Sequence, residues 1–356
     1  MNRRSVTKAM LFGGVAAGLG NRVRAQSLRK VAINFGLTYV PISSSNLFAV
    51  PQAMGFWREE GLDVQVQLAN GVGSAVQQLI AGQVVATCGG LPPTMTLINK
   101  GAPLIIAASL NGRNVYYPVA LESSRVKSPA DMKGTKIGIT SASSSNVFFI
   151  RAMLQRAGLD PDRDVTMISV GAGPAAIQAL TSGRIDVLQL YESAYDQIEH
   201  QGYPLRRFND VPGFNDLTFT FGMSTRAELI KSDPDLLVRI FRGMVKGTVY
   251  AQAHPEDVVR MHWKVFPLSK PQGLSDADAM ANDLTVLKSS LKNNVAAVQG
   301  TFGLATMEAV AAMRDTMKEF DQLDRALPAE QYYTPAIVKA ANAFDRDAVR
   351  ALPARI

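Results

Sequence analysis

The sequence predicts an α/β protein made of two Rossmann-like lobes that are joined by a hinge. The first observation is an internal duplication, because Ser-Ser-Ser-Asn at 43–46 recurs 100 residues later at 143–146. The second is its context: in both places a β-rich run precedes the motif, an apolar helical segment follows it, and Gly-Leu-Asp closes that segment at 61–63 or 158–160. Such a repeated alternation favours two like units, each with a parallel sheet and helical crossovers.

Each unit contains three expected strands and two expected helices. In the first unit the strands are expected at 31–37, 64–68 and 84–87, and Gly71-Val72-Gly73 opens the second helix. In the second unit they are expected at 136–140, 165–170 and 185–190, and Gly171-Ala172-Gly173 stands at the corresponding turn. Both turns follow the second strand of a unit, which argues against a dinucleotide fingerprint. We interpret them as tight strand-to-helix turns whose backbone N–H groups could approach a ligand.

The rest of the chain connects and completes the two units. Apolar runs at 104–110 and 116–121 are expected strands, and 217–223 is expected to lead back to the first lobe. We expect lobe 1 to begin with 28–120, lobe 2 to occupy 121–218, and 219–356 to return to lobe 1, with chain crossings near 118–125 and 215–225. Helical spacing of apolar residues from Ser232 onward, and again at 276–292, 306–320 and 335–344, predicts C-terminal helices packed on lobe 1.

The N-terminus has the pattern of an export signal. A basic stretch with a twin arginine, Arg3-Arg4, precedes an apolar run at 9–19, which is shorter than the roughly 20 residues of a membrane span. Cleavage near Ala25 would remove residues 1–25 with five basic residues and no acidic one, so the formal charge would fall from +7 to +2. The pattern therefore predicts a periplasmic protein and leaves the export route open. No basic stripe remains to bind nucleic acid, so we expect no nucleic-acid partner.

Catalytic and metal-binding motifs are missing from the sequence. The three histidines, His200, His254 and His262, are not spaced as metal ligands, and no Cys-x-x-Cys or Gly-x-Ser-x-Gly pattern occurs. Cys88 is the only cysteine and ends an apolar run, so we expect an inert, buried thiol. The residues predict neither an enzyme nor a bound metal or cofactor.

Polar residues gather where strands are expected to end and helices to begin. The carboxyl ends of parallel strands meet at one edge of a sheet, and helix N-termini present unpaired N–H groups there. Both serine motifs fall at this junction, so two like lobes would face each other across a cleft lined with hydroxyl groups. Ser and Asn are also favoured helix N-caps, so capping without any ligand is the alternative.

Three stretches, taken in this order and spacing, resemble a known family. They are Met-Gly-Phe-Trp-Arg-Glu-Glu-Gly-Leu-Asp-Val at 54–64, Asp-Met-Lys-Gly-Thr-Lys-Ile-Gly-Ile at 131–139 and Gln-Ala-Leu-Thr-Ser-Gly-Arg-Ile-Asp at 178–186. From residue 30 to residue 260 the chain resembles the type II periplasmic solute-binding proteins of ABC importers, in the group that binds nitrate, taurine, aliphatic sulfonates and thiamine-pyrimidine precursors. The resemblance implies a small-molecule ligand between the lobes, hinge closure around it and a membrane permease as partner. We expect a monomer.

Carried over by position, the resemblance places ligand contacts on strand-end loops of both lobes. The expected contacts are Tyr39, Ser43, Ser44, Ser45, Asn46, Thr94, Asn111, Ser143, Ser144, Ser145, Asn146, Tyr191 and Glu192. The first-lobe loop departs from the family pattern in its length and extra serines, and Pro51 is expected to kink the helix after it. Thr94 could equally serve as a helix N-cap.

Glu192 bears on the charge of the ligand. In a cleft its carboxylate would favour a ligand with an amine or hydroxyl group over a bare anion. At a solvent-facing helix start it would be an ordinary acidic residue. Arg113 is the nearest cationic candidate, so a sulfonate or carboxylate would depend on hydroxyl and backbone N–H groups.

The sequence thus favours a non-catalytic carrier that captures a small polar or aromatic solute of sulfonate, carboxylate or pyrimidine type and presents it to an ABC permease. Two alternatives stay open. One is an enzyme of the thiamine-pyrimidine synthesis type on the same fold, although the cysteine-rich motif of that group is absent here. The other is a periplasmic sensory module that delivers its ligand to a receptor.

Overall fold

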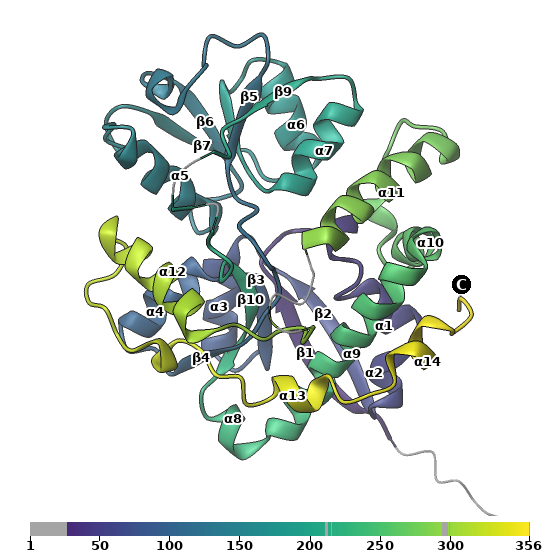
Figure 1. Ribbon diagram of the computed structural model, residues 1–356. Coiled ribbons are helices and arrows are strands. Elements are labelled where there is room, and N and C mark those ends of the chain that lie inside the picture. Colours follow the sequence, from purple (N-terminus) through teal and green to yellow (C-terminus); the bar gives the residue numbers. More distant parts are fainter. Residues whose placement is uncertain (1–26, 211–212, 215, 294–297, 299, 356) are drawn as a thin grey trace, which may run out of the picture.

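The computed structural model describes residues 27–210, 213–214, 216–293, 298 and 300–355, arranged as two lobes (Figure 1). The expected export signal at 1–25 lies outside these residues. Within them, no helix has the length and apolar character needed to cross a membrane. Each lobe is built around its own five-stranded sheet.

The lobe 1 sheet has the strand order β2-β1-β3-β10-β4. Strands β1 (Arg29–Phe35), β2 (Leu62–Leu68) and β3 (Ala86–Gly90) run parallel, as expected of a unit with helical crossovers. Strand β10 (Phe221–Arg226) returns from lobe 2 and pairs antiparallel with both β3 and β4 (Leu104–Ser109). Every residue of β3 and β4 is buried, which matches their apolar runs, since helices cover both faces of the sheet.

The lobe 2 sheet repeats this plan with the order β7-β6-β8-β5-β9. Strands β6 (Lys136–Ile139), β7 (Thr166–Ser169) and β8 (Val187–Gln189) are parallel. Strand β5 (Pro118–Leu121) arrives from lobe 1 and pairs antiparallel with β8 and β9 (Leu205–Arg207). Two lobes with the same topology confirm the predicted fold class.

The chain crosses between lobes slightly earlier than the sequence indicated. Because β5 already belongs to the second sheet, the first crossing occupies 110–117 and not 118–125. The second lies between β9 and β10, within 208–220. The apolar run at 116–121 looked like one strand, but Tyr116 and Tyr117 precede the sheet and pack in the core.

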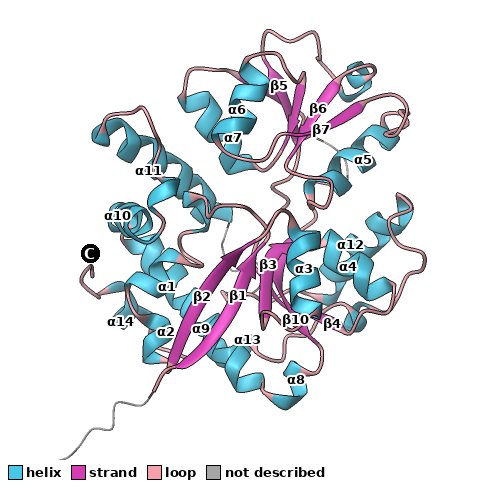
Figure 2. Ribbon diagram, turned by 180° about the vertical axis from the view of Figure 1, so that it is seen from behind, coloured by secondary structure: helices cyan, strands magenta, loops and turns pink. Residues whose placement is uncertain are grey.

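Helices flank both sheets (Figure 2). Lobe 1 has α1 (Ala49–Ala53), α2 (Phe56–Glu59), α3 (Val72–Ile80) and α4 (Pro92–Asn99), and lobe 2 has α5 (Asn146–Arg156), α6 (Pro174–Thr181) and α7 (Glu192–His200). The helix expected to kink at Pro51 breaks instead at Gly55, whose φ of 77° separates α1 from α2. Short 3-10 turns η1 (Ile42–Ser44) and η2 (Pro129–Met132) stand near the starts of the two units.

The C-terminal region is helical, as predicted. It comprises α8 (Leu229–Ser232), α9 (Pro234–Ala253), α10 (Pro255–Val265), α11 (Asp276–Asn293), α12 (Met307–Glu319), α13 (Val338–Ala341) and α14 (Arg346–Arg350), with 3-10 turns η3 (Pro267–Ser269) and η4 (Ala329–Gln331). Helix α9 starts where Asp233 caps it and buries its apolar face on lobe 1. Helix α13 is much shorter than the expected 335–344.

One C-terminal helix does more than pack on lobe 1. Helix α11 contacts η1 and α10 of lobe 1 and also α7 of lobe 2 (Figure 1). The sequence did not indicate this bridge, because α11 carries no motif that distinguishes it from a helix packed on lobe 1 alone.

Candidate functional site

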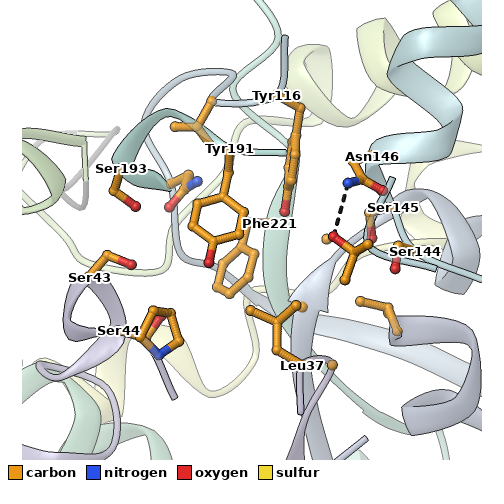
Figure 3. Close-up of a pocket in the computed structure, with 18 of the residues that line it drawn as sticks. Leu37, Ser43, Ser44, Tyr116, Ser144, Ser145, Asn146, Tyr191, Ser193 and Phe221 are labelled. Atoms are coloured by element: carbon orange, nitrogen blue, oxygen red, sulfur yellow. Dashed lines mark hydrogen bonds between the residues drawn. The ribbon is translucent and has the colours of Figure 1, made fainter. Parts of the chain in front are cut away.

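A cavity lies between the two lobes, where the strand-end loops of both sheets meet. Its volume is about 100 Å³. A single water needs roughly 10–15 Å³ on the same measure. Its lining comes mainly from the end of β1 and the segment after it, the end of β3, the crossing at 110–117, the β6–α5 loop, the start of α7, the first residue of β10 and Ser290 of α11. The volume suits a small organic molecule, and Figure 3 shows side chains of both lobes around it.

Much of the wall is apolar or aromatic. The residues of this kind are Phe35, Leu37, Pro41, Leu47, Val72, Val115, Tyr116, Tyr191 and Phe221. Tyr116 is held in place by stacking on Phe149, with ring centroids 4.9 Å apart and planes 13° from parallel. Burial raises the pKa of the Tyr116 and Tyr191 hydroxyls, so both remain neutral donors or acceptors at neutral pH. A flat, partly apolar ligand would find aromatic surfaces here.

The lobe 2 hydroxyl groups lie in the β6–α5 loop. Asn146 begins α5, and its side-chain amide donates to Thr140 Oγ1 at 3.1 Å and to the Gln189 carbonyl at 2.6 Å, which fixes the loop against β8. Ser144 is bonded to Ser141 at 2.9 Å. Ser145 is 4% exposed, and its Oγ makes no hydrogen bond within the part of the chain that the structure describes. A buried, unsatisfied hydroxyl is costly, so a ligand atom that bonded Ser145 would recover that free energy.

In lobe 1 the serine motif divides between the cavity and the core. Ser43 and Ser44 of η1 line the cavity, and Ser290 Oγ donates to the Ser43 carbonyl at 2.7 Å. Ser45 turns away: its Oγ donates to the Ile42 carbonyl at 2.6 Å and lies 2.8 Å from His262 Nδ1. Asn46 also points into the lobe, where it bonds Thr248 at 3.0 Å. These core bonds hold η1 in place.

Glu192 and the two tyrosines mark the boundary of the cavity. The carboxylate of Glu192 pairs with the Arg113 guanidinium at 2.5 Å and is 13% exposed. The hydroxyls of Tyr39 from lobe 1 and Tyr191 from lobe 2 lie 3.3 Å apart. Among the lining residues that the structure describes, none is Lys, Arg or His, and Glu192 is the sole charged one. The cavity therefore presents hydroxyls, amides and one ion-paired carboxylate.

The structure brings most of the expected contacts together. Those that line the cavity are Ser43, Ser44, Asn111, Ser144, Ser145, Asn146, Tyr191 and Glu192. Those that lie outside its lining are Tyr39, Ser45, Asn46, Thr94 and Ser143. Thr94 is buried in α4, 1% exposed, and makes no cap there, because the capping position is Leu91. Ser143 and Tyr39 instead contact the opposite lobe.

Sequence reasoning missed several lining residues. Leu37, Val115, Tyr116 and Phe221 are apolar or aromatic, and nothing in their spacing distinguishes a cavity wall from a core. Ser193 follows Glu192 directly and could have been found from its place at a helix start. Ser290 lies in the middle of a helical pattern, so only its contact with η1 shows its role.

Comparisons with known proteins agree with this architecture. A family model described as "NMT1/THI5 like" matches residues 45–258. The chain belongs to this family. A putative binding protein of Brucella abortus (strain 2308) is 25% identical over 64% of this chain and 69% of its own. The formylaminopyrimidine-binding protein of Halalkalibacterium halodurans is 22% identical over 63% of this chain and 68% of its own.

Solved structures show the fold of this NMT1/THI5-like chain. A protein from Bordetella bronchiseptica RB50 has a TM-score of 0.71 over 89% of this chain and 98% of its own, at 22% identity. The periplasmic aliphatic sulphonate binding protein SsuA from Escherichia coli has a TM-score of 0.63 over 86% of this chain and 92% of its own, at 16% identity. The desulfurization enzyme DSZB has a TM-score of 0.55 over 87% of this chain and 98% of its own, at 14% identity. The chain thus has a periplasmic binding protein fold.

Proposed function

We propose that this protein is the extracytoplasmic solute-binding component of an ABC importer. The observation that supports this best is the cavity between two like lobes, lined by strand-end loops from both. A ligand there contacts both walls only when the lobes are closed, so it shifts the population toward the closed form. The closed form would then be presented to a membrane permease. The basic and apolar N-terminal pattern supports delivery to the periplasm.

The lining favours an uncharged or cationic heteroaromatic solute over a bare anion. Tyr116, Tyr191 and Phe221 supply ring surfaces, and the hydroxyls of Ser144, Ser145 and Ser193 can accept from ring or amine N–H groups. Glu192 is the one charged residue in the lining and is already paired with Arg113, so the described lining offers a bare anion no cationic side chain of its own. A relative named for formylaminopyrimidine binding points to the same class of compound. Sulfonates and carboxylates are the competing class.

An enzyme on the same fold is the second candidate, because a desulfurization enzyme shares it. The nearest pair to a nucleophile and base among the described residues is Ser45 with His262, 2.8 Å apart. Both are fully buried and neither lines the cavity. Cys88 is also fully buried, and burial raises its thiol pKa to about 12, which keeps it protonated and unreactive. These placements favour a carrier.

The proposal is tested by finding the solute and following its fate. Native mass spectrometry of the full chain, purified without refolding, should show a bound small molecule. Calorimetric titration should then show 1:1 binding of aminopyrimidines, with sulfonates and carboxylates of equal size binding at least tenfold more weakly. The solute should be recovered chemically unchanged after incubation. A transformed product would favour the enzyme, and tighter binding of sulfonates would overturn the assigned ligand class.

The double variant Ser144→Ala/Ser145→Ala provides the residue-level test. It should weaken binding by about tenfold or more, because two ligand hydrogen bonds of about 0.5–1.5 kcal/mol each are lost. Ser182→Ala, an exposed serine at the end of α6, is the matched control and should bind as the wild type does. If melting falls sharply in the double variant while affinity is unchanged, these serines only hold the β6–α5 loop in place.

A further inference from the structure

The two duplicated Gly-x-Gly turns each contact the opposite lobe. In lobe 1, the Gly73 N–H donates to the Ser143 carbonyl of lobe 2 at 3.0 Å, and Ser143 Oγ donates back to the Asn70 carbonyl at 3.2 Å. The N–H of Gly73, which the sequence left available for a ligand, is thus used within the protein. None of Gly71, Gly73 and Ser143 lines the cavity. These bonds join the lobes without passing through a ligand.

Glycine is needed at this turn because the opposite lobe comes so close. A Cβ on Gly73 would lie 2.9 Å from Ser143 Cβ, and a Cβ on Gly71 would lie 2.4 Å from Ser143 Oγ and 2.5 Å from Ser141 Oγ. Real Cβ atoms do not approach other heavy atoms this closely, so a side chain at either position would push the lobes apart or displace the loop.

The lobe 2 turn is also approached from lobe 1, but by packing and not by a hydrogen bond to the turn. Tyr39, which follows β1, reaches across so that its hydroxyl bonds Tyr191 and lies 3.2 Å from a Cβ built on Gly173. Ser143 follows β6, the first strand of the other unit. Each lobe therefore uses the loop after its first strand to contact the Gly-x-Gly turn of its partner lobe. The internal duplication places loop and turn at corresponding positions in both units.

We propose that Gly71, Gly73, Ser143 and Tyr39 form a reciprocal latch that sets the balance between open and closed lobes before any ligand binds. This inference rests on the proposed hinge closure. The four residues of the latch are positioning residues. They change the affinity for the ligand only by changing the fraction of protein that is closed. The apparent dissociation constant equals the intrinsic one divided by the competent fraction, so weakening the latch weakens binding without removing a ligand contact.

The duplication supplies a matched control for the test. Gly71 and Gly171 both have positive φ, 93° and 74°, so alanine costs backbone strain at either position. A Cβ on Gly171, however, meets no atom of the described residues within 4 Å. Gly73→Ala adds a third case, since Gly73 lies in the first turn of α3 without positive φ and alanine favours a helix there.

Small-angle X-ray scattering of the ligand-free full chain is the primary measurement. We expect Gly71→Ala and Gly73→Ala to raise the radius of gyration relative to the wild type, while Gly171→Ala leaves it unchanged. Affinity for the solute found by mass spectrometry should fall about five- to tenfold in Gly71→Ala and Gly73→Ala. The reason is that the closed form loses about one hydrogen bond between the lobes and gains a steric clash. Tyr39→Phe should shift both quantities in the same direction by less.

Each contrary result overturns the latch. The latch is refuted if neither Gly71→Ala nor Gly73→Ala has a larger radius of gyration than the ligand-free wild type. It is also refuted if Gly171→Ala raises the radius of gyration by the same amount as they do. Failure to find a bound solute would contradict the proposed function. It would not decide the latch, because the scattering measurement is made without solute. A fall in melting temperature with unchanged scattering would assign these glycines to folding alone.

Discussion

His262 should make the stability of the protein depend on pH between 7.5 and 5. The side chain is fully buried under η1, and burial lowers its pKa to about 3, an effect that the Val40 backbone carbonyl only partly offsets. In the unfolded chain its pKa is about 6.5. Below pH 6.5 the unfolded state therefore binds a proton that the folded state does not bind. The contribution of His262 to the free energy of unfolding is fully present above pH 6.5 and is lost as the pH falls toward 3.

The expected size follows from these two pKa values. A pH of 5 lies about 1.5 units below the pKa of the histidine in the unfolded chain, while the folded histidine stays neutral at this pH. The free energy of unfolding should therefore be about 2 kcal/mol lower than at pH 7.5. Urea unfolding of wild type and His262→Asn at both pH values isolates this contribution, because carboxylates common to both proteins cancel in the difference. His200→Gln, at an exposed position, should keep the wild-type dependence. Equal pH dependence in wild type and His262→Asn would refute the reasoning.

Three further changes test the site. Ser145→Ala should leave the free energy of unfolding within about 1 kcal/mol of wild type in urea titrations, since the buried hydroxyl has no partner to lose, yet weaken solute binding severalfold; a large loss of stability would contradict this. Glu192→Gln should reduce the preference for cationic over anionic solutes in competition titrations, because it removes the one charge in the lining; an unchanged preference would show that the carboxylate does not face the ligand. Ser290→Ala should weaken binding while Ser289→Ala does not, because Ser290 supports the Ser43 carbonyl; equal effects would remove α11 from the site.

The sequence was sufficient to predict the topology of both lobes. Strand-like runs and helical segments recur in the same order, and parallel pairing follows from that alternation through general rules of connection. The crossing at 110–117 was placed too late because Tyr116 and Tyr117 have strand-like character but pack beside the sheet. Local propensity does not determine which residues enter a sheet, since tertiary packing overrides it.

The candidate site was predictable only at the level of loops. The sequence located the serine motifs at strand ends, but it could not distinguish Ser44, which lines the cavity, from Ser45, which bonds His262 in the core. That difference depends on a residue more than 200 positions away. The contact of Ser290 with Ser43 depends in the same way on a distant residue of lobe 1. The contacts of Ser143 and Tyr39 depend on how the two lobes meet, which no local sequence pattern encodes.

Hydrogen exchange with and without solute tests the central claim most directly. If the ligand is held between the lobes, its addition should protect amides at 43–47 in lobe 1 and at 140–146 and 190–193 in lobe 2, at one and the same solute concentration. Helix α14, none of whose residues lines the cavity, should be unaffected and serves as the internal reference. Protection of one lobe alone, or of a surface away from these loops, would contradict the claim that the two lobes enclose the solute.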